Sequence, residues 1–208
     1  MAAKKPEFIL FLTLNFVVLL RFAESVVPQQ EEQAVGNILA AMNATSWRFN
    51  GDSCNLETIS EVAKPTQEAN ASVGCDCTVG NDSDCHVVRI DVAYNYLQGT
   101  IPPEWGLTQL QDISLLGNRL TGEIPPELGN ITTLTKLILS SNRLTGRLPT
   151  ALGQLGNLTN LRISDITGPT QGFPPLNNAT GLIRLQDVLP CAEDIECPRC
   201  EYSSSLNP

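Results

Sequence analysis

The sequence predicts a solenoid, in which short parallel β-strands stack along one axis and share an elongated core. The first observation is that residues 107–130 match residues 131–154 position for position. The second is that three polar or turn-forming positions recur in this match: Asn118/Asn142, Gly122/Gly146 and Pro125/Pro149. A fixed period of roughly 20 to 50 residues is typical of repeat architectures, whose neighbouring coils together bury a core that no coil buries alone.

The pattern inside each period is that of a leucine-rich repeat, L-x-x-L-x-L-x-x-N-x-L-x-G-x-I-P. Leucines on either side of a short strand point inward. The Asn after the strand turns inward too, where its amide has to satisfy backbone groups, because an unpaired buried amide is costly. The Gly permits a turn, and Ile-Pro keeps the next stretch extended. We therefore expect short strands on a concave face and irregular or 3-10 structure on the convex side.

About four such repeats are expected over residues 84–178. We call residues 84–106, 107–130, 131–154 and 155–178 coils 1 to 4. Coil 1 follows the pattern but is one residue short. Coil 4 has Ile166 at the position where the other coils have the inward-turning Asn, which we call the ladder position. The central pair is therefore the only fully regular part of the array.

Residues 26–83 precede the repeats and are expected to form an N-terminal cap. Apolar residues at helical spacing predict one short amphipathic helix; they are Val35, Ile38, Leu39 and Met42. Four cysteines indicate two disulfides, with three possible connectivities: Cys54, Cys75, Cys77 and Cys85. A metal site using the last three cysteines and His86 is the alternative, but an oxidising compartment favours disulfides and the spacing is not that of a common zinc module.

Residues 1–25 have the features of a cleaved secretory signal. Two lysines precede an apolar run over residues 8–20, which is too short to span a bilayer comfortably, and small residues follow it. No second apolar run of spanning length appears, so the mature chain is expected to lie outside the cell without a transmembrane helix. Six Asn-x-Ser/Thr sequons predict N-glycosylation; they are Asn43, Asn70, Asn81, Asn130, Asn157 and Asn178.

Residues 179–208 are expected to form a degenerate repeat and a cysteine-containing tail. Cys191 and Cys197 are candidates for a C-terminal disulfide, which leaves one cysteine of seven unpaired or bonded to another chain. Cys197 and Cys200 have C-x-x-C spacing, but no βαβ pattern surrounds them, so a redox role is disfavoured.

Composition and motifs disfavour catalysis and nucleic-acid binding. The formal net charge of −9 repels a phosphate backbone. The single histidine, His86, sits between a cap cysteine and the first strand, and no paired carboxylates or phosphate-binding loop stand out. We expect no catalytic residue, no metal and no cofactor, and predict a non-enzymatic binding module.

The x-L-x-G-x-I-P signature, as in Leu120-Gly122-Ile124-Pro125, resembles the plant-specific repeat of receptor kinases. The segments Cys85-His86-Val87, IDVAYNYLQGTIPPEWG and LRISDITGPTQGFPPL resemble the ectodomain of plant leucine-rich-repeat receptor-like serine/threonine kinases that carry a malectin-like domain. The resemblance implies a malectin-like domain, a membrane helix and a kinase after the repeats. This sequence lacks kinase signatures, so it resembles a truncated or splice form, located in the apoplast or on the outer side of the plasma membrane.

The outward positions of the strands are the candidate ligand site on the concave face, because they are free of the core. They are Arg89, Asp91, Tyr94, Asp112, Ser114, Lys136, Ile138 and Arg162. The partners expected are an extracellular peptide, a glycan or another receptor ectodomain. A secreted inhibitor of cell-wall-degrading enzymes and a fragment without a function of its own are the alternatives.

Overall fold

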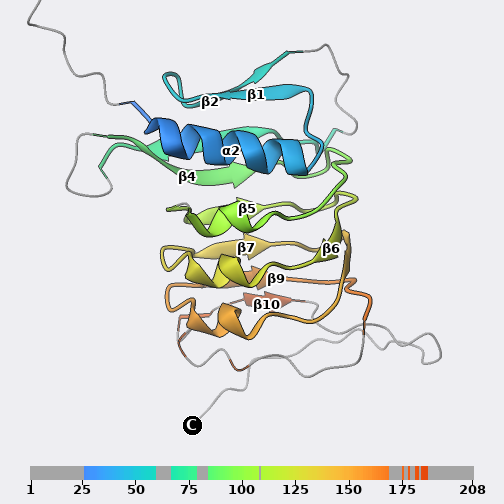
Figure 1. Ribbon diagram of the computed structural model, residues 1–208. Helices are drawn as coiled ribbons and strands as arrows, with labels where there is room; N and C mark the ends of the chain where they lie inside the picture. The colour runs from blue at the N-terminus through green and yellow to red at the C-terminus, as the bar shows by residue number, and fades with distance from the viewer. Residues whose placement is uncertain are drawn as a thin grey trace, which may run out of the picture.

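The computed structural model describes residues 26–59, 67–78, 84–107 and 109–168, together with 175, 178, 181–182 and 184–186 (Figure 1). The proposed signal segment, the tail cysteines Cys191 and Cys197, and the sequon at Asn81 lie outside these residues.

One sheet runs the length of the described chain. Its order is β10-β9-β7-β5-β4-β3, with every pair from β4 to β10 parallel and β3 antiparallel at the N-terminal edge. The bounds are β3 Ser72–Asp76, β4 His86–Asp91, β5 Asp112–Ser114, β7 Lys136–Ile138, β9 Asn160–Arg162 and β10 Arg184–Gln186. This stack of short parallel strands confirms the leucine-rich-repeat solenoid.

The register of the sheet shows the shortened first coil. Arg89 lies opposite Asp112, and Asp112 lies opposite Lys136, so the step from β4 to β5 is one residue shorter than the step from β5 to β7. The connection between β4 and β5 is therefore one residue shorter, and the paired positions of the strands stay aligned.

Short 3-10 helices form the side opposite the sheet, as the sequence predicts. They are η1 Pro103–Leu107, η2 Pro126–Asn130 and η3 Thr150–Gln154, and each packs on the next. The helix α2, Gln29–Ala41, packs on η1 and closes the N-terminal end of this layer (Figure 1). Two smaller sheets complete the described fold: the hairpin of β1, Trp47–Asn50, with β2, Asn55–Thr58, and the pair of β6, Thr121–Glu123, with β8, Arg143–Thr145.

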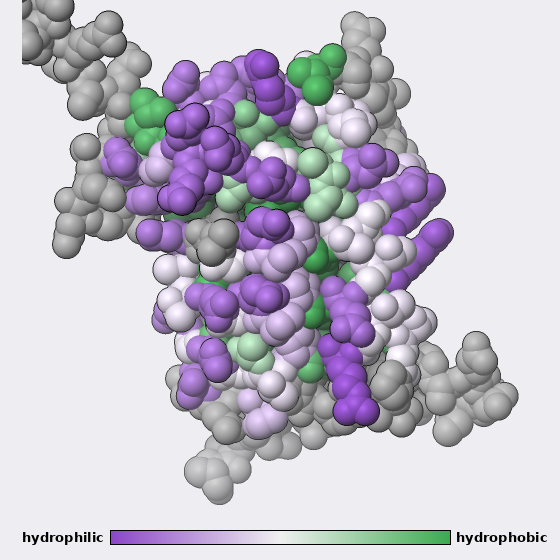
Figure 2. All heavy atoms as spheres, viewed as in Figure 1, coloured by the Kyte–Doolittle hydropathy of each residue, from purple (hydrophilic) through white to green (hydrophobic). Residues whose placement is uncertain are grey.

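The surface seen in this view is largely polar. Hydrophilic and neutral side chains cover most of it, and hydrophobic ones show only in small, separate areas (Figure 2). The apolar residues of the repeats are therefore mostly inside, as the inward direction of the leucines predicts.

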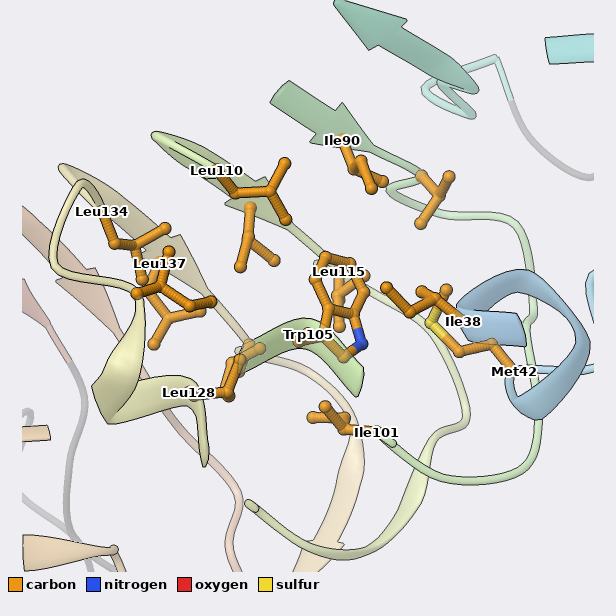
Figure 3. Close-up of a cluster of buried hydrophobic side chains, with 14 of the residues drawn as sticks. Ile38, Met42, Ile90, Ile101, Trp105, Leu110, Leu115, Leu128, Leu134 and Leu137 are labelled. Atoms are coloured by element: carbon orange, nitrogen blue, oxygen red, sulfur yellow. The ribbon is translucent and has the colours of Figure 1, made fainter. Parts of the chain in front are cut away.

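A single core runs through the cap and the coils. The predicted helix is confirmed, and its apolar stripe is buried: Val35, Ile38, Leu39 and Met42. Trp105 of η1 takes the place that Leu128 holds in the next coil, and its ring lies between Ile38 and Met42 of α2 and the leucines of the repeats (Figure 3). The larger side chain fills the space where a helix, instead of another coil, covers the core.

Two disulfides fix the cap. Cys54 bonds Cys75, which ties the β1–β2 turn to β3, and Cys77 bonds Cys85, which ties the end of β3 to the start of β4. These bonds resolve the three connectivities that the sequence leaves open. They also leave no free thiolate among the four cysteines for the alternative metal site.

A buried carboxylate joins α2 to the first repeat strand. Glu31 accepts a hydrogen bond of 2.9 Å from the backbone N–H of Val87, and its other oxygen lies 3.1 Å from Nδ1 of His86. The side chains of Glu31 and His86 are only 10% and 11% exposed. The single histidine therefore has a structural contact inside the cap.

The residue before the ladder position is left-handed in each coil. Tyr94, Gly117, Ser141 and Asp165 have φ values of 58°, 68°, 59° and 59°. Only coil 2 uses glycine there, although side-chain Cβ atoms disfavour this conformation by roughly 1–2 kcal/mol. Three coils thus hold a strained residue at the end of their strand.

Candidate binding surface on the sheet

The outward side chains of β4, β5, β7 and β9 align in two columns, because paired residues lie side by side in neighbouring strands. The first column is Arg89, Asp112, Lys136 and Asn160, and the second is Asp91, Ser114, Ile138 and Arg162. We call these two columns, with Tyr94 at the strand ends, the sheet face. The structure thus brings all eight predicted site residues onto one face; their role in binding stays a prediction.

Two charged side chains at the N-terminal end of the sheet face, Arg89 and Asp112, form an ion pair. The guanidinium Nε of Arg89 donates to a carboxylate oxygen of Asp112 at 3.2 Å, and the other oxygen accepts from the Thr135 hydroxyl at 3.1 Å. The Arg89 side chain is 62% exposed, so the pair contributes about 0–1 kcal/mol to stability. Its effect is to hold both side chains in one orientation.

Asp91 also makes hydrogen bonds, one of them to the cap. One of its oxygens accepts from the side-chain amide of Asn70 at 2.9 Å, and the other accepts from the backbone N–H of Ala93 at 3.2 Å. The side chain is half-buried. Asp91 therefore fixes the segment that leads into β3 against the first repeat strand.

Ser114 and Ile138 correct the sequence prediction. The strand pattern predicts that both are exposed, yet each is only 6% exposed. Ser114 lies beside Ile138 in the register, with Asp91 on one side of this pair and Arg162 on the other. Alternation along a strand gives the direction of a side chain, but the size of its neighbours in the adjoining coils decides whether solvent reaches it.

Tyr94 packs along the rim of the sheet face. A Cβ atom placed on Gly117 would lie 2.3 Å from Cδ1 of the Tyr94 ring, so the ring rests directly on that glycine. Glycine at position 117 is therefore needed both for its positive φ and for the space it leaves. The arrangement presents a half-buried aromatic ring beside the charged columns.

Two polar atoms of β9, which lies between β7 and β10 in the sheet, are buried. Nε of Arg162 and Oδ1 of Asn160 have no hydrogen-bond partner among the residues that the structure describes. Both side chains are half-buried. Leaving such groups unpaired is costly, and both residues belong to the same short strand, β9. The strand pattern also predicts that Asn160 points outward, although it is not one of the eight predicted site residues, and its place in the first column adds it to the sheet face.

Shifted pKa values occur on the cap, outside the sheet face. The hydrogen bond from the Arg48 guanidinium, followed by that from the Asn50 amide, lowers the pKa of Glu57. The Thr78 hydroxyl and backbone N–H likewise lower the pKa of Asp76. Both carboxylates are hairpin or edge-strand groups, and neither pattern indicates acid–base chemistry.

The sequence matches the family model for the Leucine Rich Repeat over residues 109–131 and 133–155. A probable leucine-rich repeat receptor-like serine/threonine-protein kinase of Arabidopsis thaliana is 37% identical over 165 residues, which cover 62% of this chain and 16% of the relative. A second probable kinase of this type from the same plant, RFK1, is 33% identical over 92 residues, covering 44% and 9%. The chain thus spans only a small part of the length of these relatives.

Among solved structures, the leucine-rich-repeat ectodomain of the Arabidopsis thaliana receptor kinase SOBIR1 superimposes with a TM-score of 0.56. Its identity is 19%, and the match covers 78% of this chain and 80% of that one, so it supports the fold alone. The chain is therefore similar in sequence to part of plant leucine-rich-repeat receptor-like kinases and similar in fold to the leucine-rich-repeat ectodomain of SOBIR1. None of the helices in the described residues combines the length and apolarity that a membrane crossing requires.

Proposed function

We propose that this chain is a non-catalytic extracellular module that binds a peptide or another receptor ectodomain through its sheet face. The observation that carries the proposal is the alignment of outward side chains in two columns across β4, β5, β7 and β9, which places charged, polar and apolar groups on one face beside the Tyr94 ring. The similarity to plant receptor-like kinases supports an extracellular binding role.

The proposal extends to the organisation of the chain. We infer a signal peptide at residues 1–25, a cap at 26–83, repeats at 84–178 and a degenerate repeat with a cysteine tail at 179–208. We also place the chain with the relatives that carry a malectin-like domain. The disulfide-bonded cap is the feature that supports a location outside the cell.

Binding assays on the purified, glycosylated chain test the sheet face. Immobilised protein is exposed to pools of secreted plant peptides and to purified receptor ectodomains, and the affinity of any binder is then measured for Arg162→Ala, Tyr94→Ala and Arg89→Ala. Loss of a side chain that contacts the partner closely can weaken affinity by roughly tenfold or more, and we expect this of Arg162→Ala.

Arg147→Ala is the matched control, because Arg147 is an exposed arginine outside both columns. It should leave affinity unchanged. A binder whose affinity is the same for all three sheet-face variants would contradict the assignment of the site, and a partner that binds equally well to the unfolded chain would contradict the function.

A further inference from the structure

A pocket of about 530 Å³ lies in the N-terminal cap, separate from the sheet face. Its walls come from three segments that are distant in the sequence. These are the β1–β2 hairpin with the turn before it, residues 69–71 ahead of β3, and residues 95–98 after β4. The pocket therefore lies where the cap meets the first coil, and whatever fills it would connect the two.

The lining of this cap pocket is uncharged, in a chain with a formal net charge of −9. Trp47 and Tyr96 provide aromatic rings, and hydroxyl or amide groups come from Ser46, Thr58 and Gln98. A charged ligand would be desolvated there without a partner, which is unfavourable. Aromatic rings that can cover C–H faces, combined with neutral donors and acceptors, suit a neutral, hydroxyl-rich molecule such as a carbohydrate.

The Tyr96 ring is held in place before any ligand arrives. Tyr96 has a left-handed φ of 56°, and the guanidinium of Arg119 lies 4.4 Å from the centre of its ring. The residue is nevertheless 43% exposed. A fixed, accessible ring is a preorganised contact, because little side-chain entropy remains to be lost on binding.

The source of the carbohydrate is indicated by two asparagines in the pocket lining. Asn43 and Asn70 each begin an Asn-x-Ser/Thr sequon. The side-chain amide of Asn70 donates to Asp91 at 2.9 Å. The backbone of Asn70 makes two further hydrogen bonds: its N–H donates to the carbonyl of Ala93, and its carbonyl accepts from the side-chain amide of Asn95. Asn70 is thus part of the cap structure, which leaves Asn43 as the better carrier.

Asn43 has the geometry of an attachment point. It is exposed, closely follows α2 and has a left-handed φ of 54°, with its backbone N–H bonded to the carbonyl of Ala40 at 3.0 Å. Its side-chain amide makes no hydrogen bond to any other residue described by the structure. The backbone is fixed while the amide nitrogen remains available.

We propose that the cap pocket holds the first sugars of an N-linked glycan on Asn43, packed against Trp47 and Tyr96. The bond between Nδ2 of Asn43 and C1 of the first N-acetylglucosamine forms as C1 leaves the diphosphate of a lipid-linked donor, and the amide gives up one proton. The glycan then acts as part of the cap, because it fills the junction between the hairpin and coil 1.

The test uses the full chain secreted from a eukaryotic host that attaches glycans. Mass spectrometry measures occupancy at each sequon. Acrylamide quenching of tryptophan fluorescence then reports on Trp47, because the chain has two tryptophans and Trp105 is fully buried. Asn43→Gln should increase the quenching and lower the melting temperature by about 2 to 4 °C, which is a modest effect for a chain of this size.

Asn130→Gln is the matched control, since Asn130 is an exposed sequon on coil 2 outside the pocket. It should remove its own glycan without changing the quenching of Trp47. Trp47→Leu should make the melting temperature insensitive to Asn43→Gln, which a merely solubilising glycan would not do.

Three results would overturn the proposal. Asn43 could be found unoccupied, or occupied with quenching unaffected by its removal. The third is that added N-acetylglucosamine oligomers protect Trp47 in the fully glycosylated protein, which would show that the pocket is open to a free sugar.

Discussion

The central coils and the end coils differ in how they satisfy the backbone at the ladder position. In the centre, Asn118 reaches back into coil 1: its amide donates to the carbonyls of Val92 and Leu115 at 3.0 Å each, and its oxygen accepts from the N–H groups of Asn95 and Leu97. Asn142 is likewise buried one coil later: its amide donates to the carbonyls of Leu115 and Leu139, and its oxygen accepts from the N–H of Leu120. Each central asparagine therefore joins two coils.

The end coils lack this connection. Asn95 of coil 1 has no repeat before it, and its amide donates instead to the carbonyls of Asn70, in the cap, and Ala93. In coil 4 the position is Ile166, which packs partly buried against the core. The ladder asparagine therefore satisfies backbone groups of the preceding coil. The array is held most firmly in its centre, and its N-terminal end depends on the cap.

The largest effect is expected for Asn118→Ala. The substitution leaves buried carbonyl and N–H groups of coil 1 without partners, and we expect a loss of about 3 kcal/mol in the free energy of unfolding. Asn95→Ala, the matched change at the half-buried end position, should cost only about 1 kcal/mol. Urea unfolding followed by circular dichroism measures both, and equal losses would refute the contrast between centre and end.

The second effect concerns the close stacking of the 3-10 helices. A Cβ atom on Gly129 would lie 2.4 Å from the backbone oxygen of Ala151 in the next coil, so Gly129→Ala forces the coils apart and should cost about 2 kcal/mol. Gly36→Ala is the control, because no atom lies within 4 Å of its Cβ position in α2. It should stabilise the chain by up to about 1 kcal/mol through helix propensity. Thermal melts that move in the same direction for the two variants would argue against tight stacking.

The repeats could be predicted from the sequence because their geometry is local and periodic. The repeat period fixes which leucines face inward, and the strand register follows it from β5 onward. The short coil 1 could be predicted for the same reason. Leu110 and Leu134, for example, occupy the same position in coils 2 and 3, and both are fully buried.

The cap and the details of the sheet face could not be predicted, because they depend on contacts between distant segments. Glu31 of α2 and Val87 of β4 lie far apart in the chain, and no pattern in the sequence links them. The burial of Ser114 and Ile138 depends on side-chain sizes in adjoining coils, which alternation along one strand does not contain.

A smaller effect, of opposite sign, is expected at the left-handed turn of coil 3. Coil 2 has Gly117 at this position, whereas coil 3 has Ser141 at φ 59°. Ser141→Gly removes the Cβ strain and should stabilise the chain by about 1 kcal/mol, reduced by the greater entropy of glycine in the unfolded state. The Ser141 side chain is exposed, so its removal costs little packing energy.

The converse change, Gly117→Ser, should destabilise the chain by more than this gain, because a Cβ atom there would meet the Tyr94 ring. Urea midpoints compare the two, and a stabilising Gly117→Ser would contradict the reasoning.

The smallest effect is a pH dependence confined to the cap hairpin. Arg48 lowers the pKa of Glu57 below its value in the unfolded chain, so the folded state binds this proton less readily. The stabilisation is therefore fully present above the unfolded pKa and is lost as the pH falls through the lower folded pKa. The Arg48–Glu57 pair lies at the surface, so its contribution to stability is small and screened by salt.

Glu57→Gln should reduce the drop in melting temperature between pH 6 and pH 3, at low ionic strength only. The coils, which lack this pair, should show no matching change in hydrogen exchange, and a change spread evenly over both regions would contradict a hairpin origin.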